Sequence, residues 1–154
     1  MIYSTAAGVT LVQATPRTAG NLAVVSTAGV WTAVDTNTDI VIPAAAGDRL
    51  AIWGNFLTDA NTNLNGLDVG TVVSGAVVNY VSSGTGTPLV EGLNAFYPHG
   101  NTFQVNQPAV YDVQAGDVSG GNVRLRLFYL ASGAANIYAS AAHPLAWTVA
   151  NFRQ

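Results

Sequence analysis

Residues 122–130 alternate between apolar and arginine side chains without interruption: Asn122-Val123-Arg124-Leu125-Arg126-Leu127-Phe128-Tyr129-Leu130. Successive side chains of a β-strand point to opposite faces, so this period of two predicts a strand. Its odd-numbered residues from 123 to 129 share one face, and Arg124, Arg126 and Phe128 share the other. Two arginines on one face indicate that this face is exposed to solvent or contacts another subunit.

The rest of the chain repeats this pattern in shorter pieces. Turn residues recur about every 8–12 positions, and the runs between them are rich in Val, Ile, Thr and aromatic residues. This spacing predicts an all-β fold, a jelly-roll-like antiparallel β-sandwich. The expected strands cover residues 9–12, 22–26, 29–34, 39–42, 49–56, 67–73, 76–82, 103–105, 109–113, 122–130, 137–140 and 145–149.

Three turns are predicted in more detail. Ser74-Gly75 separates two apolar runs and predicts a β-hairpin. Ala46-Gly47-Asp48 precedes the strand 49–56, and Ala115-Gly116-Asp117 precedes the strand 122–130. In such turns Asp supplies local hydrogen bonds and Gly supplies a positive φ, so equivalent turns in two halves of the chain fit a jelly-roll topology.

The first 20 residues show little alternation, apart from the short run 9–12. We therefore expect an extended N-terminal arm over residues 1–20 and a β-sandwich domain over residues 21–154. An arm of this kind lies on a neighbouring subunit or is disordered, and its deletion is expected to leave a folded domain. The residues expected to contact a neighbour are Ile2, Tyr3, Val9, Leu11 and Arg17 of the arm, with Arg124, Arg126 and Phe128 of the strand.

Composition limits the class of partner. Charged residues make up 8% of the 154, against about 25% in an ordinary soluble domain, while apolar residues reach 49%. This balance indicates a surface covered by neighbouring subunits; the other interpretation is a small domain coated with Thr, Asn and Ser. The net charge is −3 and the five arginines are scattered, which argues against nucleic acid as a partner.

Neither a membrane-spanning helix nor a disulfide is expected. A membrane-spanning helix needs about 20 consecutive apolar residues, and the apolar runs here are short and interrupted. The start of the chain lacks the pattern of a secretory signal. The absence of cysteine excludes disulfides and thiolate metal sites.

The residues that could carry catalysis do not form a known pattern. No Gly-x-Ser-x-Gly motif is present, and the two histidines, His99 and His143, lie in turn-like segments. Glu91 is the only glutamate, so the carboxylate pair of a glycosidase would need an aspartate that the sequence does not place. The alternating oxygen donors from Asp59 to Asn65 lack the Gly and Glu of a calcium loop. We therefore predict no enzyme, no cofactor and no metal site.

Several segments resemble virion surface proteins of tailed phages that infect actinobacteria. The resemblance extends over residues 30–152 and implies a jelly-roll-like sandwich, commonly trimeric, that serves as a capsid decoration (cement) protein, a head fibre or a tail-associated module. It implies no catalytic residue. The segments that carry it are Val30-Trp31-Thr32-Ala33-Val34-Asp35, Ile40 to Asp48, Ser74 to Tyr80, Ala115-Gly116-Asp117, Gly121 to Leu127, and Ala142-His143-Pro144-Leu145.

Two functions follow as hypotheses. The first is a homotrimeric decoration protein that stabilises a phage head by contacts with the major capsid protein or other virion subunits, which places the chain on the capsid surface. The second is a carbohydrate- or receptor-binding module of a phage tail. The second predicts an exposed aromatic side chain beside Asn or Asp donors, such as Tyr97, or Trp53 near Asn55.

Overall fold

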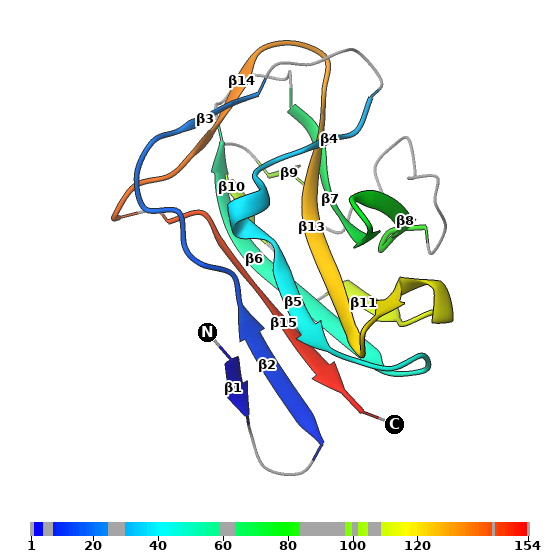
Figure 1. Cartoon of the computed structure of the whole chain (residues 1–154). Helices are drawn as coiled ribbons and strands as arrows, with labels where there is room; N and C mark the ends of the chain where they lie inside the picture. The colour runs from blue at the N-terminus through cyan, green and yellow to red at the C-terminus, as the bar shows by residue number, and fades with distance from the viewer. Residues whose placement is uncertain are drawn as a thin grey trace.

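The chain folds into two antiparallel β-sheets that pack face to face (Figure 1). The computed structural model describes residues 2–4, 8–24, 30–58, 64–83, 98–99, 102–104, 109–142 and 144–153. Every strand pair in these ranges is antiparallel, and the only helical elements there are two 3-10 turns. The predicted all-β sandwich is confirmed.

The larger sheet is built around β6, which pairs with β15, β10, β11 and β14. Its described edge runs from β15 through β2 to β1. The nine described strands of this sheet are β1 (Ile2–Ser4), β2 (Val9–Gln13), β3 (Leu22–Val24), β6 (Arg49–Thr58), β9 (Pro98–His99), β10 (Thr102–Gln104), β11 (Ala109–Asp112), β14 (Ala135–Tyr138) and β15 (Ala146–Phe152).

The smaller sheet is built around β13, the strand predicted at residues 122–130. This strand pairs with β5 on one side and with β7 and β12 on the other. The chain passes from β5 to β6 and from β11 to β12, so it crosses between the sheets, as jelly rolls do. The six described strands are β4 (Thr32–Ala33), β5 (Ile40–Pro43), β7 (Leu64–Val73), β8 (Ala76–Tyr80), β12 (Val118–Ser119) and β13 (Asn122–Ala131).

The core lies between the two sheets and follows the predicted alternation. Val123, Leu125 and Leu127 of β13 are fully buried against residues of the facing sheet such as Ile52 and Trp147. The indole nitrogen of Trp147 donates to the carbonyl of Thr38 at 2.9 Å, so the largest core side chain has no unsatisfied donor.

The β7–β8 hairpin forms at the predicted turn. Ser74 (φ 52°) and Gly75 (φ 86°) both adopt the left-handed conformation that a two-residue type I′ turn requires. The resulting turn is short and holds the ends of β7 and β8 in a fixed register.

The two Ala-Gly-Asp turns share a hydrogen-bond pattern. In each, the Asp backbone N–H donates to the carbonyl three residues earlier at 3.1 Å. The carboxylate then accepts the N–H of that earlier residue, Ala45 for Asp48 (3.0 Å) and Gln114 for Asp117 (2.8 Å). Gly47 has a positive φ of 93°, as expected. The same expectation for Gly116 is wrong, because this glycine lies inside the 3-10 turn η2 (Ala115–Asp117), whose φ is negative.

The carboxylate of Asp117 ties the two sheets together at one end of the sandwich. It is fully buried and accepts hydrogen bonds from the hydroxyls of Tyr111 on β11 and Thr71 on β7, both at 2.6 Å. It also accepts from the side-chain amide of Asn79 on β8 at 2.8 Å. Burial and the neighbouring Asp117 raise the pKa of Tyr111, so its hydroxyl stays a neutral donor.

The N-terminal segment predicted as an arm is attached to the sandwich along one edge. Strand β2, expected at residues 9–12, pairs with β15 over five positions. The backbone N–H of Ala14 then donates to the carbonyl of Trp147 at 2.9 Å, and Arg17 forms a bridge to Leu145. Val12 and Ala14 are buried in the core at 5% and 2% exposure, so part of the segment 1–20 belongs to the folded domain.

Candidate functional site

The outer face of the six-stranded sheet, which points away from the core, carries two arginines and a group of aromatic side chains. Arg124, Arg126 and Phe128 of β13 project there, because their odd-numbered neighbours fill the core. The predicted division of this strand into two faces is therefore confirmed. The outer face has a polar part around the two arginines and an aromatic part around Phe128.

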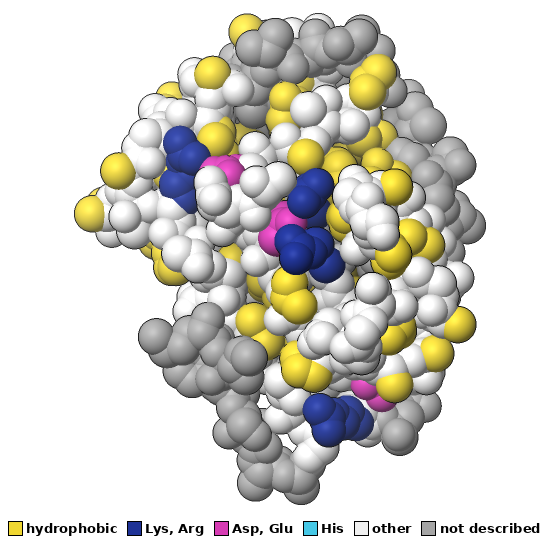
Figure 2. Space-filling model, in the orientation of Figure 1, with side chains coloured by type: hydrophobic (Ala, Val, Ile, Leu, Met, Phe, Trp, Pro, Cys, Tyr) yellow, Lys and Arg dark blue, Asp and Glu magenta, His cyan; other side chains and the backbone are white. Residues whose placement is uncertain are grey.

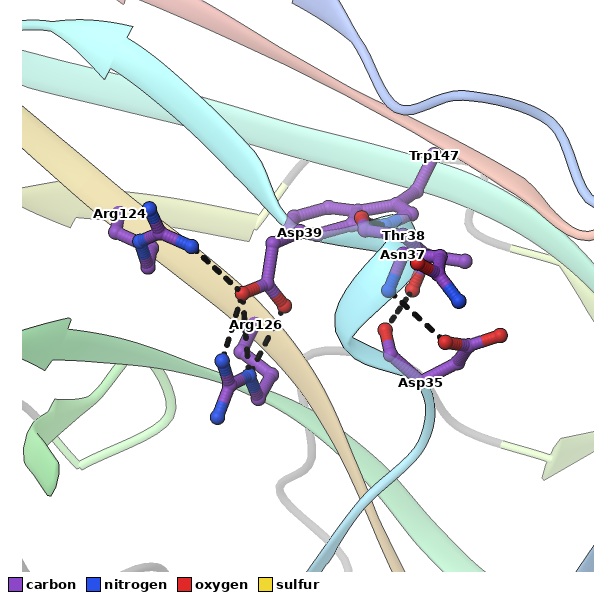
Figure 3. A network of polar contacts seen from close by, with 7 residues as sticks. All are labelled: Asp35, Asn37, Thr38, Asp39, Arg124, Arg126 and Trp147. Atoms are coloured by element: carbon purple, nitrogen blue, oxygen red, sulfur yellow. Dashed lines mark hydrogen bonds and ion pairs between the residues drawn. The ribbon is translucent and has the colours of Figure 1, made fainter. Parts of the chain in front are cut away.

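In the polar part, both arginines contact the carboxylate of Asp39 (Figure 3). Arg126 makes close contacts, with Nη2 at 2.8 Å and Nε at 3.0 Å, and these hydrogen bonds raise its pKa. Arg124 makes one longer contact, from Nη1 at 3.4 Å. One carboxylate thus faces two cations, which leaves a local charge of about +1.

Asp39 is positioned by the 3-10 turn η1 (Thr36–Thr38), which ends directly before it. At the start of the turn, the Asp35 carboxylate accepts the N–H of Asn37 at 2.9 Å, as N-cap residues do. At its end, the N–H of Asp39 donates to the Thr36 carbonyl at 3.3 Å. Since Trp147 of the core holds the Thr38 carbonyl, the turn and Asp39 are fixed to the sandwich (Figure 3).

Next to the arginines lies a hollow of about 440 Å³ between β5, β13 and the β7–β8 turn. Its lining combines apolar side chains with hydroxyl, amide and guanidinium groups. The apolar lining residues include Val41 and Val72, and the polar ones are Ser74, Ser119, Asn122, Arg124 and Arg126.

The aromatic part of the outer face is a compact cluster. The rings of Tyr80 and Phe128 meet edge to face with centroids 5.4 Å apart, and Trp31 lies 6.1 Å from Tyr80. Phe128 lies across Gly70 of β7, where an added Cβ would come within 2.9 Å of its ring. A glycine is needed at position 70 for the ring to lie this close to the strand.

Beside this cluster, Asp68 is a fully buried carboxylate. It accepts the N–H of Val69 at 2.8 Å, the N–H of Ser82 at 3.3 Å and the Ser82 hydroxyl. Four arginines pair with other aspartates: Arg17 with Asp35, Arg49 with Asp112, and Arg124 and Arg126 with Asp39. Burial therefore outweighs the three hydrogen bonds and raises the pKa of Asp68 from 3.8 to about 6.

This pKa predicts a stability change between pH 4 and pH 6. Because the folded-state pKa of Asp68 exceeds the unfolded value, its contribution to stability is complete below pH 4 and is lost as the pH rises through 6. Asp68→Asn, which keeps the shape and removes the charge, should raise the free energy of unfolding at pH 8 by up to roughly 3 kcal/mol.

Urea titrations of Asp68→Asn and the unmodified protein at pH 4 and pH 8 measure this effect, since other titrating groups cancel in the difference. The gain at pH 8 should shrink toward zero at pH 4. An equal difference at both pH values would contradict the assigned pKa.

The structure places the eight predicted contact residues in two parts of the fold. Ile2 and Tyr3 are in β1, although only their backbone is described; Val9 and Leu11 are half-buried in β2. Arg17 binds Asp35 at 2.7 Å, Arg124 and Arg126 bind Asp39, and Phe128 is 6% exposed. The ring of Phe128 packs within the chain and offers little surface to another subunit. The subunit contact itself stays a prediction.

Sequence reasoning missed the two acidic residues that define this face. Asp39 lies 85 and 87 residues from its arginine partners, and no local pattern connects them. Asp68 lies in a predicted strand, but its burial beside Phe128 results from the pairing of β7 with β13, which no local pattern indicates. Of the buried aspartates, Asp117 differs from these two, because the Ala-Gly-Asp sequence that it shares with Asp48 predicted its turn.

The described residues hold no cluster of three or more His, Asp or Glu side chains that could bind a metal ion. Among the same residues, no helix is long and apolar enough to span a membrane. Glu91, His143, residues 59–63 and Tyr97 lie outside the described ranges, as do the side chains of Asn55 and His99.

Comparison of the chain with known protein families, curated proteins and solved structures gives no match.

Proposed function

We propose that this chain is a structural protein of virus particles, and more particularly a capsid decoration protein that stabilises the head of a tailed phage as a homotrimer. The observation that carries the proposal is that the surface of the described residues is nearly neutral and partly apolar. Four of the five arginines are paired with aspartates of the same chain, and Figure 2 shows basic side chains beside acidic ones with apolar surface between them. Such a surface favours contact with other protein surfaces over binding of highly charged partners.

Exposed apolar side chains give this surface its adhesive character. Val30, Val41, Val110 and Phe152 are 41–56% exposed; Val41 lies in the smaller sheet, Val110 and Phe152 lie in the larger one, and Val30 lies before β4. Burial of such side chains against neighbouring subunits is favourable in proportion to the apolar area removed from water. A trimer that places three copies of a weak contact on one lattice gains avidity without a new contact type.

The work of such a protein is mechanical. Each bound copy stabilises the assembled shell over the disassembled subunits by mass action, and no reactive group is required. The described residues suit this role, since the buried carboxylates of Asp117 and Asp48 are bound within the fold.

Immunogold labelling of phage particles that carry this chain tests the proposal. Gold distributed over the head is expected, together with copurification of the chain with intact particles. Gold confined to the tail would contradict a decoration role and support the tail module. Particles without label, with the chain left in the soluble fraction, would contradict both.

The second candidate, a carbohydrate- or receptor-binding module, is favoured by the hollow beside Arg124 and Arg126. It is not favoured by the aromatic platform expected from the sequence. Trp53 is half-buried, and the other members of that platform, Tyr97 and the side chain of Asn55, lie outside the described parts of the structure.

A further inference from the structure

We propose that the hollow between β13 and the β7–β8 turn binds an acidic sugar, with the guanidinium of Arg124 as the group that binds the sugar carboxylate. The proposal does not depend on a virion location, since it concerns the isolated chain.

The two arginines have different roles. Arg126 is committed to Asp39 through two nitrogens at 2.8 and 3.0 Å, and its side chain is 16% exposed. Arg124 touches Asp39 through a single nitrogen at 3.4 Å, and its side chain is 52% exposed. The guanidinium of Arg124 therefore keeps donors for a ligand, and its planar fork matches the two oxygens of a carboxylate.

The charge around the hollow favours an anion. Among the described residues, Asp39 is the carboxylate that contacts the arginine pair, and it balances one of the two cations. Asp117, which precedes the lining residue Ser119, is fully buried and points its oxygens at Tyr111 and Thr71. The field beside the two arginines is thus positive, although the whole chain carries a charge of −3.

The remaining lining suits a sugar better than a bare anion or a protein carboxylate. Ser74, Ser119 and Asn122 offer hydroxyl and amide groups for sugar hydroxyls, and Val41 and Val72, on the strands that flank β13 on its two sides, offer apolar contacts for the C–H groups of a ring. The volume of about 440 Å³ lies within the range of roughly 300–1,000 Å³ that is typical of small-ligand pockets.

The site is also built on rigid elements. Arg124 and Asn122 come from the central strand β13, and Val41 comes from β5, which pairs with it. Ser74 lies in a two-residue turn whose positive φ values fix its geometry. Groups held by paired strands need little reorganisation on binding, which favours affinity.

The test is a titration of the full chain with D-glucuronate, followed by NMR of the backbone amides. Saturable shifts are expected at Gly75 and Ser119, with D-glucose binding about tenfold more weakly because it lacks the charge. Arg124→Ala should weaken glucuronate binding at least about tenfold. The affinity of Arg124→Lys for glucuronate should lie between the affinities of the unmodified chain and of Arg124→Ala, because lysine keeps the charge and loses the planar fork.

Arg49→Ala is the matched control. Arg49 is an exposed arginine bound to Asp112, so this variant removes the same charge elsewhere and should leave the affinity unchanged. Unfolding curves of both variants verify that they are folded.

Three results would overturn the proposal. The first is glucuronate binding that is absent, or equal in Arg124→Ala and the unmodified chain. The second is N-acetylaspartate amide binding as tightly as glucuronate, which would assign the site to a protein carboxylate. The third is tighter binding of inorganic phosphate than of glucuronate.

Discussion

Replacement of Asp117 by alanine is expected to lower the free energy of unfolding by about 4 kcal/mol or more, because several buried donors lose their acceptor at once. The hydroxyls of Tyr111 and Thr71, the amide of Asn79 and the N–H of Gln114 all donate to this carboxylate. Domains of ordinary stability unfold with about 5–15 kcal/mol, so the loss would remove most of the stability of a domain at the low end of this range.

Urea denaturation monitored by tryptophan fluorescence measures this loss. The matched control is Asp112→Ala, which removes an exposed carboxylate that pairs with the exposed Arg49, and should change stability by less than about 0.5 kcal/mol. A loss below about 1 kcal/mol for Asp117→Ala would show that the buried network is not formed in solution.

Deletion of residues 1–14 is expected to destabilise the domain by several kcal/mol, in contrast to the expectation from sequence that the segment is a removable arm. The deletion takes away β2 and with it Val12 and Ala14, which are buried in the core. It also leaves β15 without one of its two partners over five residue positions. Large-to-small changes at single core positions alone reduce stability by about 1–5 kcal/mol.

Deletion of residues 1–7 distinguishes the contribution of β1 to stability from that of β2. This shorter deletion removes β1, whose recorded partner is β2, and keeps β2 in the sheet. It should reduce stability by less than about 1 kcal/mol, since edge elements open at low free energy. Equal midpoints in urea for the deletion of 1–14 and the intact chain would contradict the position of β2 in the core.

The parts of the fold that depend on local pattern could be predicted from sequence. The alternation in β13 identifies both its strand state and its two faces, and Ser74-Gly75 identifies the hairpin, because turn chemistry and side-chain period act over a few residues. The Ala-Gly-Asp turns were visible for the same reason. Only the conformation of Gly116 differed, since a 3-10 turn replaced the expected left-handed glycine.

The parts that depend on distant contacts could not be predicted. The run 9–12 predicts a strand, but nothing local indicates that it pairs with β15. Asp39 meets Arg124 and Arg126 only because β5 and β13 are neighbours. Asp68, whose burial raises its pKa, lies beside Tyr80 and Phe128, and this arrangement forms only when β7, β8 and β13 lie side by side.

The function proposed here depends on association between copies of this chain, and light scattering of the purified full chain measures it directly. A uniform species of three times the 15.9 kDa chain mass is expected, and it should persist on dilution through the micromolar range. A monodisperse species of one chain mass across that range would contradict a protein that works by burying its neutral, partly apolar surface against other subunits.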